Sequence, residues 1–258
     1  MTKVIAVLAG KGGTGKTTSS IGLGAALTYF GKDVVVVDTN LTTPNVGIHL
    51  GAPVVPINLH HVLRGKNKVK DAIYVHPKGL KIIPASIALK DLMVADPARL
   101  AEVIGELKKT NPDFILLDGA AGLGREALSA LECAEEVLVV TNPELPAITD
   151  ALKTVGLAEQ LQKNVLGVVL TKVGASDNDI NLKNIESLLE RPIISVIPYN
   201  NVVRESLIMK DSVVFTHPKS EPAIGYKKLA AALIGQEYSE DSEKGDGLIS
   251  RMFKRFFN

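Results

Sequence analysis

Short apolar runs recur along the chain and predict buried β-strands. They are rich in Val, Ile and Leu and show no alternation with polar residues. The runs are Val4–Leu8, Val34–Val37, Leu80–Ile83, Phe114–Leu117, Val137–Val140, Val165–Leu170 and Ile193–Ile197. Continuous apolar segments of this length are typical of strands covered on both faces, as in a parallel sheet.

Longer segments with helical spacing of apolar residues lie between several of these runs. Ser19–Tyr29, Pro97–Lys109 and Asp150–Gln162 are the clearest examples. Strands that alternate with helices favour right-handed βαβ units. The pattern therefore predicts an α/β fold with a doubly wound, mostly parallel sheet.

The hydrophobic pattern changes near the end of the chain and predicts three segments. Residues 1–235 read as one globular domain, and residues 236–247 are acidic and polar, as in a flexible linker. Residues 248–258 are apolar and basic. At about 100° per residue, these apolar and basic side chains take opposite sides of a helix.

A basic amphipathic helix of this kind suits attachment to an anionic membrane surface. We expect the residues that contact the membrane to be Leu248, Ile249, Arg251, Met252, Phe253, Lys254, Phe256 and Phe257. The same helix could instead pack onto the domain or bind a protein partner.

Composition excludes some classes of protein. The chain has 258 residues, a net charge of +1 and one cysteine, so it offers no general attraction to nucleic acid and no disulfide framework. No apolar run reaches the ~20 residues that span a bilayer, and the first residues lack a signal peptide. We expect a cytoplasmic protein that binds the membrane peripherally.

One motif identifies candidate chemistry. The segment after the first predicted strand matches G-x-x-x-x-G-K-[ST], the phosphate loop of P-loop NTPases. Its backbone N–H groups would hold phosphates, a lysine would contact the β- and γ-phosphates, and a threonine hydroxyl would bind Mg²⁺. The nucleotide-binding residues are Gly10, Lys11, Gly12, Gly13, Thr14, Gly15, Lys16, Thr17 and Thr18.

Two carboxylates follow predicted strands at the edge of the sheet where ligands bind. Asp38 comes after Val34–Val37, and Asp118 comes after Phe114–Leu117. Together with Thr17, they form the expected Mg²⁺ site.

The chain resembles the MinD/ParA family of ATPases with a deviant phosphate loop, most closely the archaeal MinD-like proteins. The resemblance rests on the extra lysine Lys11 and on segments spread over the chain: Val37-Asp38, Pro44–Gly47, Leu117-Asp118 with Gly122, Asn142–Glu144, Asp150 and the tail. It implies ATP and Mg²⁺ as cofactors, and a homodimer in which Lys11 reaches the partner's phosphates. It also implies adenine contacts at Thr171 and Pro198, and a pairing of Asp150 with Lys11 in one nucleotide state.

One position departs from this family. Asn40 stands where MinD relatives carry an aspartate that is tied to hydrolysis, and an amide cannot accept a proton as a carboxylate does. We therefore predict slow hydrolysis with intact binding. The expected catalytic residues are Lys11, Lys16, Asp38, Asn40 and Asp118.

The resulting hypothesis is an ATP-dependent dimerising switch that binds membrane reversibly and positions division or polar machinery through an unidentified protein partner. Two alternatives remain: a ParA-like partition ATPase bound to DNA, and a membrane scaffold that does not hydrolyse ATP. The near-neutral charge disfavours nucleic acid.

Overall fold

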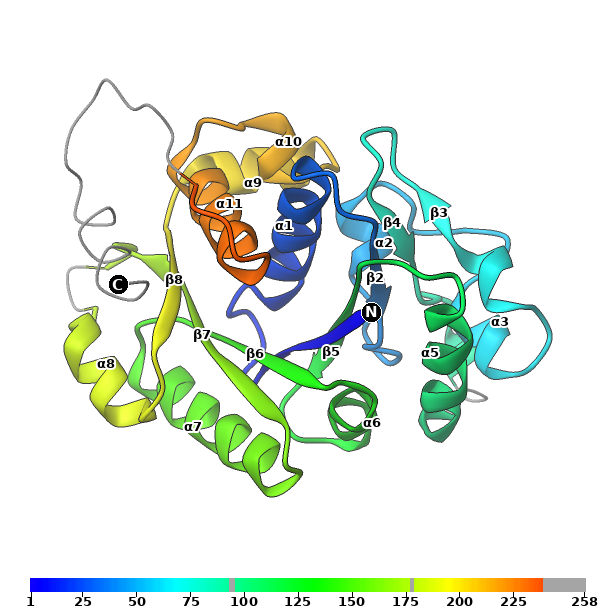
Figure 1. Ribbon diagram of the computed structural model, residues 1–258, viewed down its shortest axis with the longest axis horizontal. Helices are drawn as coiled ribbons and strands as arrows, with labels where there is room; N and C mark the ends of the chain where they lie inside the picture. Colours follow the sequence, from blue (N-terminus) through cyan, green and yellow to red (C-terminus); the bar gives the residue numbers. More distant parts are fainter. Residues whose placement is uncertain (93–95, 177–178, 239–258) are drawn as a thin grey trace.

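A mostly parallel sheet organises the computed structural model, which describes residues 1–92, 96–176 and 179–238 (Figure 1). Within these residues eight strands follow the order β3-β4-β2-β5-β1-β6-β7-β8, and β3 alone runs antiparallel to its neighbour. The strands are β1 (Lys3–Ala9), β2 (Val34–Asp38), β3 (Tyr74–Val75), β4 (Lys81–Ile83), β5 (Phe114–Ala121), β6 (Glu136–Thr141), β7 (Asn164–Val173) and β8 (Ile193–Pro198). The predicted fold class is confirmed.

Helices cover both faces of the sheet. The α-helices are α1 (Lys16–Tyr29), α2 (Val46–His49), α3 (Leu59–Leu63), α4 (Leu89–Leu92), α5 (Leu100–Lys108), α6 (Arg125–Cys133), α7 (Leu145–Gln160), α8 (Leu182–Leu189), α9 (Asn201–Ile208), α10 (Val213–Thr216) and α11 (Glu221–Leu233). Two 3₁₀ turns, Val69–Ala72 and Pro97–Arg99, complete the described helical segments. In Figure 1, α1, α9, α10 and α11 lie on one face, and α5, α6, α7 and α8 lie on the other.

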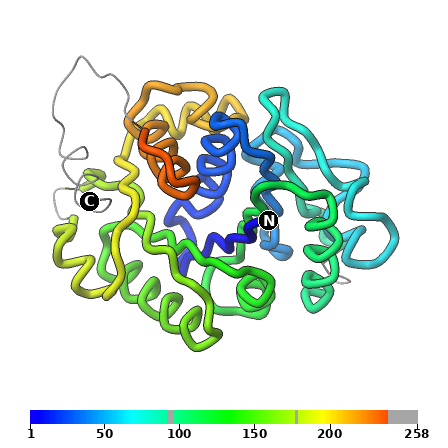
Figure 2. Tube along the Cα trace, viewed as in Figure 1, coloured from blue at the N-terminus to red at the C-terminus, as the bar shows by residue number. Residues whose placement is uncertain are grey.

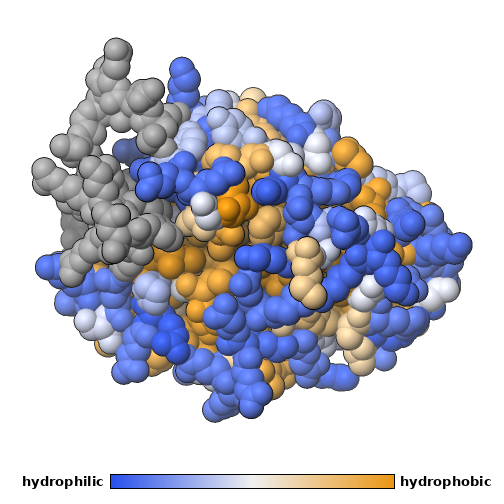
Figure 3. All heavy atoms as spheres, in the orientation of Figure 1, coloured by the Kyte–Doolittle hydropathy of each residue, from blue (hydrophilic) through white to orange (hydrophobic). Residues whose placement is uncertain are grey.

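Alternate residues of the central strand β1 enter two separate hydrophobic cores. Val4, Ala6 and Leu8 face the core under α5–α8, whereas Ile5 and Val7 face the core under α1, α10 and α11. Side chains of a strand alternate between the two faces of a sheet, so a strand covered on both sides needs apolar residues throughout. On the face of the molecule shown in Figure 3, hydrophobic residues gather near the middle and hydrophilic residues surround them.

Close packing of α1 against α11 fixes the helix that follows the phosphate loop. The two helices run side by side (Figure 2). A Cβ atom at Gly22 would lie 2.6 Å from the ring of Tyr226, so only glycine allows this approach. The Tyr226 hydroxyl lies 3.2 Å from that of Ser19, in the first turn of α1.

Several predicted elements have different bounds in the structure, and one strand was not predicted. Helix α7 begins at Leu145 rather than Asp150, with a proline in its first turn. Strand β5 continues to Ala121, so Asp118 lies within the strand rather than after it. The short edge strand β3 was not predicted, since two residues carry no period.

The C-terminal segments lie mostly beyond the described part. The predicted helix of residues 248–258 and residues 239–247 of the predicted linker fall outside it. Tyr238 is described, and its ring contacts Phe30 at the end of α1 with centroids 5.8 Å apart. Among the described helices, none has the length and apolar content to cross a bilayer.

Candidate functional site

The phosphate loop connects β1 to α1, and glycine is required at several of its positions. Gly13 and Gly15 have φ angles of 80° and 90°, a region that residues with side chains seldom occupy. A Cβ atom at Gly10 would lie 2.3 Å from the carbonyl oxygen of Asp150. The motif therefore reflects both the curl of the loop and its contact with α7.

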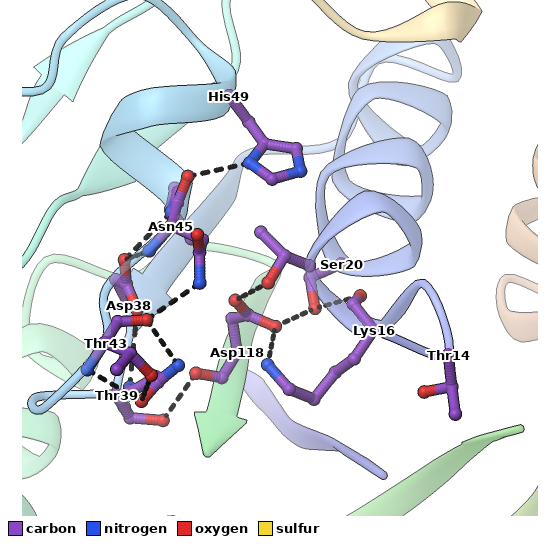
Figure 4. Close-up of polar contacts among 12 residues, drawn as sticks. Thr14, Lys16, Ser20, Asp38, Thr39, Thr43, Asn45, His49 and Asp118 are labelled. Carbon is purple, nitrogen blue, oxygen red and sulfur yellow. Dashed lines mark hydrogen bonds and ion pairs between the residues drawn. The ribbon is translucent and has the colours of Figure 1, made fainter. Parts of the chain in front are cut away.

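Three side chains from the start of α1 converge on Asp118 (Figure 4). Lys16 Nζ lies 2.8 Å from Oδ1, Thr17 Oγ1 donates to Oδ2 at 2.7 Å, and Ser20 Oγ donates to Oδ1 at 2.9 Å. Asp118 is fully buried and Lys16 nearly so. Sequence reasoning missed Ser20, although its position one helical turn after Lys16 places it on the same face.

Asp38 lies beside Asp118, but its hydrogen-bond donors are backbone N–H groups rather than side chains. The two residues are register partners on the parallel strands β2 and β5. The carboxylate of Asp38 accepts the N–H groups of Asn45 at 2.8 Å, Val46 at 2.9 Å and Asn40 at 3.3 Å. These bonds tie the start of α2 to the end of β2.

The charges around Asp38 and Asp118 favour the binding of a cation. Complete burial and the neighbouring charge of Asp118 raise the pKa of Asp38 to about 8, against the opposing effects of the Val46 N–H group and Lys16. Two buried carboxylates therefore face one lysine. Mg²⁺ is commonly held by one or two carboxylates together with phosphate oxygens and water. Thr17, Asp38 and Asp118 fit this role.

The side chain of Asn40 closes a turn in the loop after β2. Its Nδ2 donates to the carbonyl of Thr43 at 2.6 Å, and its Oδ1 accepts the backbone N–H and hydroxyl of Thr43 at 3.3 and 3.1 Å. Both ends of the amide are engaged, and the residue is buried. The adjacent Thr42 binds Glu126 on α6, which links this loop to the segment after β5.

Lys11 stands apart from the buried cluster. Its side chain is 45% exposed, and its Nζ lies 3.4 Å from Glu144. The predicted pairing with Asp150 is absent from this conformation, because Asp150 faces Lys153 at 3.1 Å. Glu144 also accepts a hydrogen bond from Asn142 at 2.8 Å.

The two predicted adenine-contacting residues occupy different environments. Thr171 is 3% exposed and its hydroxyl donates to the carbonyl of Thr14 in the phosphate loop. Pro198 ends β8 and is half-buried, beside the exposed Tyr199. Contact of either residue with adenine remains a prediction.

The loop, the helix that follows it and the two strand-borne carboxylates define a P-loop nucleotide-binding domain. The comparison with known proteins specifies the family. The model of the CobQ/CobB/MinD/ParA nucleotide binding domain matches residues 5–213. The chain belongs to this family, whose MinD/ParA members are ATPases, and the resemblance seen in the sequence is confirmed.

Individual relatives agree with this assignment. An uncharacterised ATP-binding protein of Methanocaldococcus jannaschii is 36% identical over 258 residues, which covers all of this chain and 97% of the relative. The structure of the septum site-determining protein MinD of Pyrococcus horikoshii, complexed with Mg-ADP, has a TM-score of 0.86 and 38% identity over 90% of this chain and 96% of that one. A MinC:MinD cell division protein complex of Aquifex aeolicus matches with a TM-score of 0.82 and 27% identity, covering 95% and 100% of the two chains. The expected cofactors agree with the Mg-ADP of the Pyrococcus structure.

Proposed function

We propose that this chain is an ATP-dependent dimerising switch that binds membrane reversibly, positions division or polar machinery, and hydrolyses ATP slowly. One observation carries the proposal. Asp38 and Asp118 are fully buried as neighbours, Lys16 and Thr17 contact Asp118, and Lys11 is exposed at the same loop. Such a site suits Mg²⁺ with a nucleotide and leaves Lys11 available to a second copy.

Each residue has a role that follows from its contacts. Thr17, Asp38 and Asp118 would hold Mg²⁺, and Lys16 would exchange the carboxylate of Asp118 for phosphate oxygens. Lys11 would leave Glu144 at little cost, because an exposed pair contributes about 0–1 kcal/mol. When bound, ATP with Mg²⁺ supplies the phosphoryl group that is transferred to water.

Slow hydrolysis follows from Asn40. An asparagine accepts no proton from water, and here both ends of its amide are bound to Thr43. The same observation favours a second candidate function, a membrane scaffold that binds ATP without useful turnover. Comparing steady-state ATP turnover of the protein with that of Asn40→Asp tests the role of this residue. Equal rates would remove Asn40 as the cause of slow hydrolysis.

Membrane attachment rests on the tail sequence and on the family. One short amphipathic helix binds weakly, and two helices on a dimer gain avidity. MinD proteins among the relatives are described as septum site-determining, and the Aquifex complex pairs MinD with MinC. A partner protein that binds the membrane-bound dimer is therefore part of the proposal. The proposed site of action is the cytoplasmic face of the membrane.

Liposome co-sedimentation with ATP, ADP or no nucleotide tests the proposal. The full chain should sediment with anionic vesicles in ATP. Two separate variants, one ending at Gly247 and one carrying Lys11→Ala, should stay in the supernatant. Phe253→Gln keeps every charge of the tail and removes one apolar side chain. It should also weaken vesicle binding, which separates the apolar contribution from the charge. If the full chain does not bind vesicles in any of the three conditions but binds duplex DNA in ATP, the hypothesis of a ParA-like partition ATPase replaces this proposal.

A further inference from the structure

Two consecutive residues at the end of β7 contact consecutive carbonyl groups of the phosphate loop. The Thr171 hydroxyl donates to the carbonyl oxygen of Thr14, and Lys172 Nζ donates to that of Gly13 at 2.7 Å. Thr171 is buried, whereas Lys172 is exposed. The phosphate loop is thus held from a strand that lies two places from β1 in the sheet.

The backbone of β7 is irregular where these contacts are made. Its pairing with β8 shifts register between Thr171 and Val173, and Lys172 has a φ of 57°. This left-handed conformation is uncommon for a residue with a side chain. The irregular strand end and the lysine contact occur at the same residue, beside the loop.

The two contacts determine which way the neighbouring amides point. In a planar trans peptide, the N–H group points opposite to the carbonyl of the preceding residue. Holding the carbonyls of Gly13 and Thr14 toward β7 therefore turns the N–H groups of Thr14 and Gly15 to the other side. Successive N–H groups that point into one concavity form an anion site.

We propose that Thr171 and Lys172 are positioning residues that set the amides of Thr14 and Gly15 for phosphate before the nucleotide arrives. The proposal rests on nucleotide binding at this loop. It assigns the Thr171 hydroxyl to the loop rather than to adenine, since its single hydrogen is directed at backbone carbonyls.

Calorimetry with tripolyphosphate, ATP and GTP, each with Mg²⁺, separates the two roles. Thr171→Val should weaken tripolyphosphate and ATP by the same factor, about tenfold, because a buried carbonyl loses its donor. Lys172→Met should weaken both about threefold, since its bond is exposed. The ratio of ATP to GTP affinity should not change, and Thr171→Ser and Lys172→Arg should restore binding.

Lys210→Met provides a matched control. Lys210 is an exposed lysine with a φ of 56° that lies against Gly51, so the substitution removes the same charge from the same backbone conformation. It should leave tripolyphosphate affinity within twofold of that of the unchanged protein. Weakening equal to that of Lys172→Met would assign the effect to charge alone and overturn the role of Lys172.

Two further outcomes would overturn the proposal. Unchanged tripolyphosphate affinity with a lower ratio of ATP to GTP affinity would show that Thr171 contacts adenine. Unchanged affinity for all three ligands in Thr171→Val and Lys172→Met would show that the loop keeps its shape without these two side chains.

Should Thr171→Val not fold, Lys172→Met carries the same comparison. If the unchanged protein binds no tripolyphosphate and no ATP, the proposed function itself fails.

Discussion

In the described part of the chain, carboxylates are buried in two places, and their surroundings shift the carboxyl pKa in opposite directions. At the phosphate loop, Asp38 and Asp118 lie side by side with one lysine, and the pKa of Asp38 is raised to about 8. In helix α4, the buried Asp91 accepts a hydrogen bond from Ser86 Oγ at 2.6 Å and is paired with Arg64. The hydrogen bond from Ser86, followed by the Arg64 guanidinium, lowers the pKa of Asp91 to about 2.

We propose that this difference separates a carboxylate with a structural role from one that would bind a ligand. Asp91 has a full set of partners within the chain, so its charge stabilises the fold. Asp38 and Asp118 share too little positive charge, so the folded protein without ligand keeps an electrostatic cost that Mg²⁺ would relieve. A buried carboxylate whose pKa is raised is therefore the better indicator of function.

Asp118→Ala should have the largest effect on stability. It leaves Lys16 buried without its partner, and breaking a buried pair typically costs about 3–5 kcal/mol. Urea unfolding measures the loss, and nucleotide binding should disappear as well. Adding Lys16→Met should recover part of the stability but none of the binding. A loss below about 1 kcal/mol would show that the pair is not desolvated as the structure indicates.

Mg-ADP should stabilise the protein through the first carboxylate site and not through the second. At one hundred times its dissociation constant, a ligand that binds only the folded state adds about 2.7 kcal/mol. Thermal unfolding with Mg-ADP, and with Mg-ADP plus EDTA, measures this gain. Asp91→Asn should keep the gain and Asp38→Asn should lose most of it. An equal gain in both variants would remove Asp38 from the metal site.

Asp91→Asn should cost about 1–3 kcal/mol at neutral pH, because Arg64 loses a charged partner. The pKa of Asp91 falls from 3.8 in the unfolded chain to about 2 in the folded protein, so its contribution is present above pH 3.8 and is lost as the pH falls through 2. The urea midpoints of the protein and of Asp91→Asn should therefore converge between pH 4 and pH 2. Parallel midpoints over that range would contradict the assignment.

Asn40→Asp should have the smallest effect on stability. A carboxylate cannot donate to the carbonyl of Thr43, so one hydrogen bond of the turn is lost, at about 0.5–1.5 kcal/mol. The same substitution is expected to raise ATP turnover, and the freed loop should be cut faster by a protease near Thr43. An unchanged cleavage rate would indicate that the remaining bonds hold the turn alone. Thr43→Val, which removes only the hydroxyl contact, is the matched control.

Local chemistry made much of the site predictable. The spacing of glycines with Lys16 and Thr17 identified the phosphate loop, because the curled backbone and the phosphate contacts need those residues in that order. Continuous Val and Ile runs identified the central strands, since strands covered on both faces need apolar residues throughout. Asp38 could be assigned to the ligand edge because it ends such a run.

The sequence by itself thus determined the class of fold, the phosphate loop and the candidate metal ligands, because each strand, loop or carboxylate was assigned from a short local pattern. Only the tertiary structure decided that Ser20 joins Asp118, that Asn40 closes on Thr43, that Lys11 faces Glu144, and that Lys172 reaches Gly13. The contacts of Ser20, Lys11 and Lys172 join segments more than ninety residues apart. The order of strands in the sheet and the packing of helices on it set such contacts, and no local spacing encodes them.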